Sequence, residues 1–93
     1  MTHILSAALA PFEKAIPDTT VRDVTTLLLV PTDGPVTFAA LAVASGLPKG
    51  SLTRWTDKII EAGLVIRKTD PADGRGKLIA LTAKGRKLVV GRA

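Results

Sequence analysis

The fold is decided by residues 37–63, which read TFAALAVASGLPKGSLTRWTDKIIEAG. Thr37 is placed to cap a short amphipathic helix, and Gly46 can adopt the positive φ that ends such a helix in a sharp turn. The apolar positions of this first helix are Phe38, Leu41, Ala42 and Ala44. Pro48 suits the first position of a second helix, because its missing N–H would be unpaired there anyway. Two helices joined by a short turn that contains glycine predict a helix-turn-helix unit over residues 36–62.

The second helix of this unit, expected over residues 49–62 and closed by Gly63, separates its side chains by chemistry. The residues that recur on the apolar side are Leu52, Trp55, Thr56 and Ile59. The residues on the opposite, polar side are Lys49, Ser51, Thr53, Arg54 and Asp57. Because Trp55 follows the apolar spacing, we expect it in the core and not stacked on a base.

The polar side of this helix has what a DNA major groove requires near its amino end. Lys49, Gly50 and Ser51 can meet phosphate or base edges, and backbone N–H groups at a helix amino end favour phosphate. Thr53 and Arg54 are the candidates for base contact, Arg54 because a guanidinium can bind guanine through two hydrogen bonds. Every amphipathic helix has a polar side, so at this point an ordinary solvated surface is the equal alternative.

Two short strands follow, expected over residues 64–68 and 77–81, with a Pro/Gly-rich turn over residues 69–76 between them. The turn is too long for a two-residue hairpin, so the loop must project. Its flanking and internal bases are Arg67, Lys68, Arg75 and Lys77. Arg75 lies near the tip, where the potential of a minor groove would attract it, and Asp73 is close enough to orient its guanidinium. The alternative is a solvated turn with a weak ion pair.

Helices are also expected before this central region. Residues 2–15 have apolar side chains at helical spacing, interrupted at Pro11. A second amino-terminal helix ends before Pro31, with Asp18 or Thr19 placed to cap it. The apolar face of that second helix consists of Val21, Val24, Leu27 and Leu28.

Charge is distributed unevenly along the chain. Residues 1–48 carry two bases and four acids, a net charge of −2, whereas residues 49–93 carry eleven bases and four acids, a net charge of +7. The attraction for a phosphate backbone therefore lies in the carboxy-terminal half. Part of this charge belongs to a last helix, expected over residues 82–93 and capped by Thr82. Its bases, expected to form a solvated face, are Lys84, Arg86, Lys87 and Arg92.

Composition excludes several classes of protein. The 93 residues include no cysteine and one histidine, which excludes disulfides, thiolate metal sites and paired catalytic histidines. No glycine-rich phosphate loop or plausible acid–base pair is present, so we expect neither an enzyme nor a cofactor. The longest strongly apolar run, residues 27–30, is far too short to span a membrane. We therefore expect a cytoplasmic protein without a membrane partner. A mean hydropathy of +0.30 is high for a small basic domain and suggests that a partner covers apolar surface.

Residues 36–85 resemble the multiple-antibiotic-resistance-repressor (MarR) family of winged helix-turn-helix regulators. The matching segments are VTFAALA (36–42), SLTR (51–54), GLVIR (63–67), DPADGR (70–75) and LTAKG (81–85). The most specific part of the match is the Asp-x-Arg wing followed by Leu-Thr-x-x-Gly. The stretch GLPK (46–49) is also similar to the helix-turn-helix of the isocitrate-lyase-regulator family. The wing favours the first family.

The resemblance implies a sequence-specific DNA-binding transcriptional regulator, usually a repressor, that binds palindromic sites as a homodimer. In that family the second helix of the motif reads the major groove. The arginine that Arg75 matches enters the minor groove, and the aspartate that Asp73 matches orients it. Many members release DNA when a small, often phenolic, effector binds near the dimer interface. Members usually continue with further helices that build the dimer, whereas Ala93 follows soon after the last matching segment. We therefore expect dimer contacts within residues 1–30.

These observations predict one winged helix-turn-helix domain over residues 1–93, mainly α with a small β-hairpin. Its expected parts are the amino-terminal helices (1–30), the helix-turn-helix (36–62), the wing hairpin (64–81) and the last helix (82–93). The candidate contacts to double-stranded DNA are Lys49, Gly50, Ser51, Thr53, Arg54, Arg67, Lys68, Arg75 and Lys77. The alternative is a winged-helix module for protein–protein contact, because a fold does not settle a function.

Overall fold

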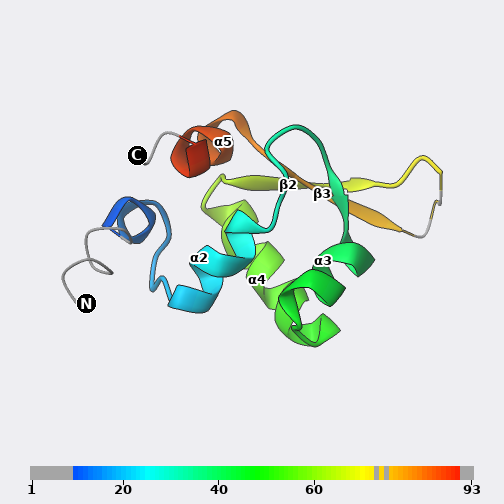
Figure 1. Ribbon diagram of the computed structural model, residues 1–93, viewed down its shortest axis with the longest axis horizontal. Coiled ribbons are helices and arrows are strands. Elements are labelled where there is room, and N and C mark those ends of the chain that lie inside the picture. Colours follow the sequence, from blue (N-terminus) through cyan, green and yellow to red (C-terminus); the bar gives the residue numbers. More distant parts are fainter. Residues whose placement is uncertain (1–9, 73, 75, 91–93) are drawn as a thin grey trace.

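The computed structural model describes residues 10–72, 74 and 76–90 (Figure 1). Residues 10–15 are helical, and the later elements follow in the predicted order. These are α2 (Val21–Leu28), β1 (Val36–Thr37), α3 (Phe38–Ser45), α4 (Lys49–Glu61), β2 (Val65–Thr69), β3 (Lys77–Leu81) and α5 (Ala83–Val90). The arrangement is that of a winged helix-turn-helix, mainly helical with a small antiparallel sheet, as the sequence predicts.

The sheet has three strands in the order β1-β3-β2, all antiparallel. β1 was not predicted, because only two residues pair and Thr37 was assigned to a helix cap. Both roles are real. Thr37 lies opposite Leu78 in the sheet, and its hydroxyl accepts a hydrogen bond from the N–H of Ala40 at 3.0 Å. β1 therefore ties the start of α3 to the middle strand.

One core joins the helices to the sheet. In Figure 1, α2, α3 and α4 lie on one side of the strands, while α5 and the paired ends of β2 and β3 at Thr69 and Lys77 lie at opposite ends of the molecule. The fully buried side chains come from the amino-terminal segment, the helices α2, α3 and α4, and the wing: Phe12, Ile16, Leu27, Leu41, Leu52, Ile59, Leu64 and Ile79. Burying one such side chain contributes about 1.5–3 kcal/mol. Leu52 and Ile59 are among these side chains, so burial of one face of α4 sets the orientation of this helix.

The predicted apolar face of α2 is only half correct. Val24 and Leu27 are buried, but Val21 is 57% exposed and Leu28 is 40% exposed. The other buried positions of the helix are polar, Asp23 and Thr26. The hydroxyl of Thr26 bonds to its own helix backbone, and Asp23 meets α4, so these two residues can occupy the inner face. The predicted cap is also displaced, because Thr20 and Asp23 form a reciprocal capping box and neither Asp18 nor Thr19 is the cap.

α3 differs from the predicted amphipathic helix. Its side chains are apolar up to Ser45, and Leu41 is its one buried residue. Phe38 and Ala42 pack against the core as predicted, whereas Ala44 is exposed and Val43 is 85% exposed. Gly46 ends α3 with a positive φ of +70°, as predicted. Pro48 is the N-cap of α4 and not its first helical residue.

The β2–β3 hairpin confirms the predicted wing. β3 has its predicted bounds, and β2 is shifted by one residue, to Val65–Thr69, so Thr69 belongs to the strand and not to the predicted turn. Thr69 pairs with Lys77, and the N–H of Asp70 donates to the carbonyl of Gly76 at 2.9 Å, which closes the base of the loop. Asp73 and Arg75, the predicted tip residues, lie outside the described residues.

α5 is attached to the start of the wing through backbone contacts. Thr82 caps the helix as predicted, accepting from the N–H of Gly85 at 3.0 Å, and its hydroxyl donates to the carbonyl of Gly63 at 2.6 Å. The N–H of Thr82 donates to the carbonyl of Leu64 at 2.9 Å. A Cβ on Gly85 would lie 2.0 Å from that same carbonyl oxygen. Glycine is therefore required here for close approach and not for its φ.

Candidate nucleic-acid interface

α4 presents the predicted polar face to solvent and buries the predicted apolar face. Leu52, Trp55, Thr56 and Ile59 are all buried, and the Thr56 hydroxyl is satisfied by the carbonyl of Leu52 at 2.8 Å. The opposite face exposes Lys49, Gly50, Thr53, Arg54 and Asp57, with Ser51 half-buried beside them. Each predicted α4 residue thus lies on the side the sequence assigned to it.

The amino end of α4 is open. Pro48 makes no side-chain cap bond, so the N–H groups of the first turn, which have no intrahelical acceptor, stay available to an anion. The hydroxyl of Thr53 donates to the carbonyl of Lys49 at 2.9 Å. In this arrangement the Thr53 oxygen keeps lone pairs that can accept a hydrogen bond from a base, for example from the amino group of cytosine or adenine.

The base of the wing lies next to this open helix end. A hollow of about 430 Å³ is lined by Thr37, Phe38, Ala39, Lys49, Asp70, Gly76 and Lys77. It brings together two predicted contacts from distant parts of the sequence, Lys49 on α4 and Lys77 on β3. The lining carries two cations and one acid, Asp70, so the hollow has a net positive charge. A phosphate could therefore contact both cations here.

Strand alternation separates the remaining wing cations. Arg67 lies on the same face of β2 as buried Val65, and Lys77 lies opposite Thr69 on that face. Lys68 is on the other face of the strand, so the structure does not group it with Arg67 and Lys77. The guanidinium of Arg67 donates to the carboxylate of Asp57 on α4 at 2.9 Å.

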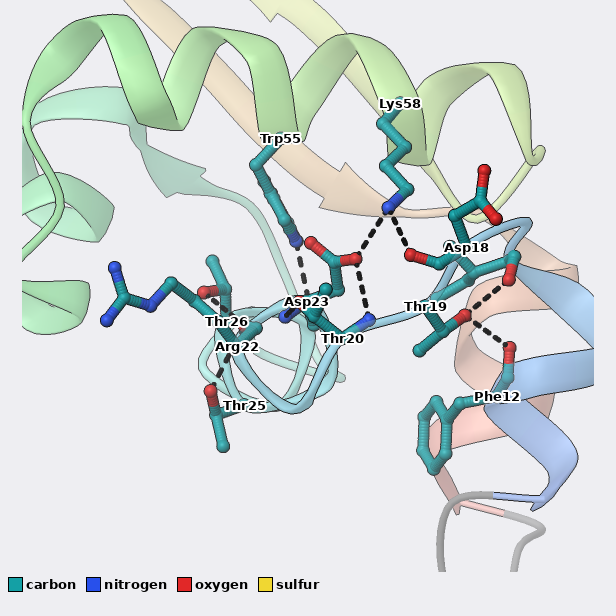
Figure 2. A network of polar contacts seen from close by, with 11 residues as sticks. Phe12, Asp18, Thr19, Thr20, Arg22, Asp23, Thr25, Thr26, Trp55 and Lys58 are labelled. Atoms are coloured by element: carbon teal, nitrogen blue, oxygen red, sulfur yellow. Dashed lines mark hydrogen bonds and ion pairs between the residues drawn. The ribbon is translucent and has the colours of Figure 1, made fainter.

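Sequence reasoning missed a cluster that joins α2 to α4. The ammonium of Lys58 donates to the carboxylate of Asp23 at 2.7 Å and to the carbonyl of Asp18 at 2.8 Å. The indole N–H of Trp55 donates to the backbone carbonyl of Asp23 at 3.2 Å. Figure 2 shows Trp55 and Lys58 converging on Asp23 from one side of α4. The capping pattern of Thr20 and Asp23 was the one signal in the sequence that could have indicated this role.

Lys84, Arg86 and Lys87 of α5 are exposed, as predicted, and Arg92 lies outside the described residues. Two of the exposed cations also make contacts within the structure. Lys84 donates to the carbonyl of Ala62 at 3.0 Å, and Arg86 donates to the carbonyl of Thr32 at 3.0 Å. Each holds a neighbouring segment against α5 from an exposed position.

Among the residues that the structure describes, no group of three acids or histidines could hold a metal ion, and no helix is both long enough and apolar enough to cross a membrane.

Comparison with known proteins agrees with this geometry. The model of the MarR family matches residues 20–77, which include the helix-turn-helix, β2 and the first residue of β3. No curated protein matches the chain by sequence.

Solved structures match nearly the whole chain. Wild-type MarR of E. coli is 27% identical with a TM-score of 0.78, and the match covers 97% of this chain and 63% of that one. The MepR–DNA complex of S. aureus is 26% identical with a TM-score of 0.81, covering 97% and 73%. A mutant E. coli MarR complexed with operator DNA is 27% identical with a TM-score of 0.79, covering 97% and 61%. The chain thus spans less than two thirds of the length of the E. coli proteins.

Proposed function

This chain belongs to the MarR family, and on that premise we propose that it is a sequence-specific regulator of transcription that binds double-stranded DNA and acts as a repressor. Two of its structural neighbours are complexes with DNA, one of them with an operator. The observation that carries the proposal is the open, polar amino end of α4 beside the base of the wing, where Lys49 and Lys77 share one hollow.

In this proposal α4 enters the major groove and the wing, residues 69–76, reaches the adjacent minor groove. The uncapped N–H groups at Lys49, Gly50 and Ser51 would bind phosphate, and Thr53 and Arg54 would reach base edges. Arg75 would enter the minor groove, oriented by Asp73, as the family resemblance implies. Arg67, Lys68 and Lys77 would contribute phosphate contacts along the wing.

The direct test is selection of bound duplexes from a random pool, followed by affinity measurements over a range of salt concentrations. Each phosphate contact contributes about −0.9 to the slope of log affinity against log salt, so we expect a steep slope. A fixed sequence should be enriched. Binding that ignores salt, with no enriched sequence, would reject the proposal and favour a module for protein–protein contact.

Arg54→Ala sharpens the test at one residue. If Arg54 reads a guanine, the loss should be about 1–3 kcal/mol and confined to one base pair. Arg54→Lys is the matched control, because it keeps the charge but loses two-pronged binding. Equal weakening on every sequence would place Arg54 on phosphate instead.

We also propose that the chain binds DNA as a homodimer. Val90, the last residue of α5, is 61% exposed, and α5 lies at the same end of the molecule as residues 10–15 (Figure 1). One exposed valine is ordinary on a protein surface, so the proposal is carried by the family resemblance, which implies a homodimer on palindromic sites. A palindromic selected site together with a dimer mass in sedimentation would support this. A monomer on a site without symmetry would reject it.

A further inference from the structure

A second hollow lies on the other flank of α4. It has a volume of about 250 Å³ and is lined by residues of both α2 and α4. Its floor is apolar, formed by buried Leu47 and Trp55. Its remaining lining residues are Arg22, Asp23, Ser51, Arg54 and Lys58. Three cations from two helices therefore surround a space with one acid.

The carboxylate of that acid, Asp23, already accepts two hydrogen bonds. One carboxylate oxygen of Asp23 accepts from both the Lys58 ammonium, at 2.7 Å, and the N–H of Thr20, at 3.0 Å. Arg22 and Arg54 are exposed, and their guanidinium groups make no hydrogen bond or ion pair within the described part of the chain. In Figure 2 the guanidinium of Arg22 extends away from Asp23, and no dashed line ends on it. Two unpaired positive charges beside one hollow favour an anion there.

The position of this hollow relative to α4 indicates which anion. The wing meets one flank of α4 through Asp57 and Arg67, whereas the hollow lies on the flank that faces α2. A helix in a major groove, about 12 Å wide, is bordered by a phosphate strand on each side. If the wing follows one DNA strand, the other DNA strand passes the flank of α4 that faces Arg22 of α2.

We propose that Arg22 binds a DNA backbone phosphate on the α2 side of the recognition helix. This inference rests on the proposed function, and it extends the contact surface into the half of the sequence whose net charge is −2. The cluster of Trp55, Lys58 and Asp23 holds the first turn of α2 against α4, so Arg22 keeps a fixed position relative to Arg54.

The experiment compares Arg22→Ala with Lys14→Ala. Lys14 and Arg22 are the two bases of residues 1–48, and both are exposed. The two variants lose the same charge, so they match in net charge and differ in where the charge lies relative to α4. We expect Arg22→Ala to reduce the magnitude of the salt slope by about 0.9 per bound chain and to weaken all sequences similarly. Lys14→Ala should leave the slope unchanged, and Arg22→Lys should restore it.

Other results would overturn the inference in distinguishable ways. Equal slopes for Arg22→Ala and Lys14→Ala, with Arg54→Ala still altering base preference, would reject the Arg22 contact while DNA binding stands. Loss of discrimination at one base pair in Arg22→Ala would mean that Arg22 reads a base. Absence of salt-dependent DNA binding in the unmodified chain would reject the proposed function and this inference together. Because the Arg22 side chain is exposed, we expect each variant to keep the Tm of the unmodified chain. Thermal unfolding checks that a change in slope is not caused by misfolding.

Discussion

The two flanks of α4 are held by different kinds of contact, although consecutive residues of the helix make an ion pair on each. Asp57 pairs with Arg67 of the wing at 2.9 Å, where the Asp57 side chain is 58% exposed. Lys58 pairs with Asp23 of α2 at 2.7 Å, where the Asp23 side chain is 12% exposed. The second pair is further supported by the capping box and by the carbonyl of Asp18.

The exposed pair is not what holds the wing. The start of β2 is attached to α5 through the backbone, by the bond from Thr82 to Leu64 and by the close approach of Gly85 to the Leu64 carbonyl. The N–H of Leu64 also donates to the carbonyl of Ile59 at 3.1 Å, which ties the start of the wing to α4. Both flanks share the apolar core; polar side chains add to it on the α2 flank, and backbone contacts add to it on the wing flank. An exposed ion pair is worth little, so Arg67 can exchange Asp57 for a phosphate at small cost.

Gly85→Ala breaks the backbone attachment of the wing flank and should have the largest effect. The added Cβ would lie 2.0 Å from the Leu64 oxygen, and backbone must move to admit it. We expect the free energy of unfolding to fall by about 3 kcal/mol or more in urea denaturation.

Gly50→Ala is the matched control for Gly85→Ala. Gly50 is also helical, but nothing lies within 4 Å of an added Cβ. It should gain up to about 1 kcal/mol from the better helix propensity of alanine. If both variants kept the original stability, α5 would be free to shift away from Leu64.

Asp23→Ala breaks the α2 flank. It removes half of the capping box and the carboxylate partner of Lys58, so we expect a loss of about 1–2 kcal/mol. Asp23→Asn keeps an oxygen for the N–H of Thr20 and should lose less. Thermal unfolding at low and high salt separates the two contributions, because only the ion pair is screened. Equal losses in both variants would mean that the cap contributes nothing.

Double-mutant cycles compare the two ion pairs directly. The coupling between Asp23 and Lys58 should be about 1 kcal/mol, and that between Asp57 and Arg67 should be below about 0.5 kcal/mol. Substitution of Lys58 and Arg67 by methionine preserves most of the apolar stem of each side chain. A stronger coupling on the wing flank would reverse the comparison.

Asp57→Asn should have the smallest effect. Stability should change by less than about 0.5 kcal/mol, because the pair is exposed. DNA affinity should rise a few-fold, since one negative charge leaves the polar face of α4 and Arg67 is released. Glu61→Gln, which removes an exposed acid one turn further along the helix, is the control. A fall in affinity would show that Asp57 positions Arg67 for DNA.

The comparison of α4 with α3 explains where sequence reasoning succeeded. α4 alternates apolar and charged positions at helical spacing, so its buried face could be predicted residue by residue. α3 has apolar side chains up to Ser45, so its apolar pattern identified Phe38, Leu41 and Ala42 but could not show that Val43 and Ala44 face solvent. Likewise, Val21 and Leu28 matched the apolar spacing of α2, yet Asp23 and Thr26 are buried there because Lys58 and the helix backbone satisfy them.

Local rules were sufficient for the helix-turn-helix, the cap at Thr82, the turn at Gly46 and the extent of β3, because each depends on side chains or φ values within a few residues. Long-range contacts could not be predicted from the same rules. The pairing of β1 with β3, the close approach of Gly85 to Leu64, and the convergence of Lys58 and Trp55 on Asp23 join residues far apart in the chain. They arise only when the core brings those segments together, since a hydrogen bond or a steric contact acts over a few ångströms in space whatever the separation in sequence.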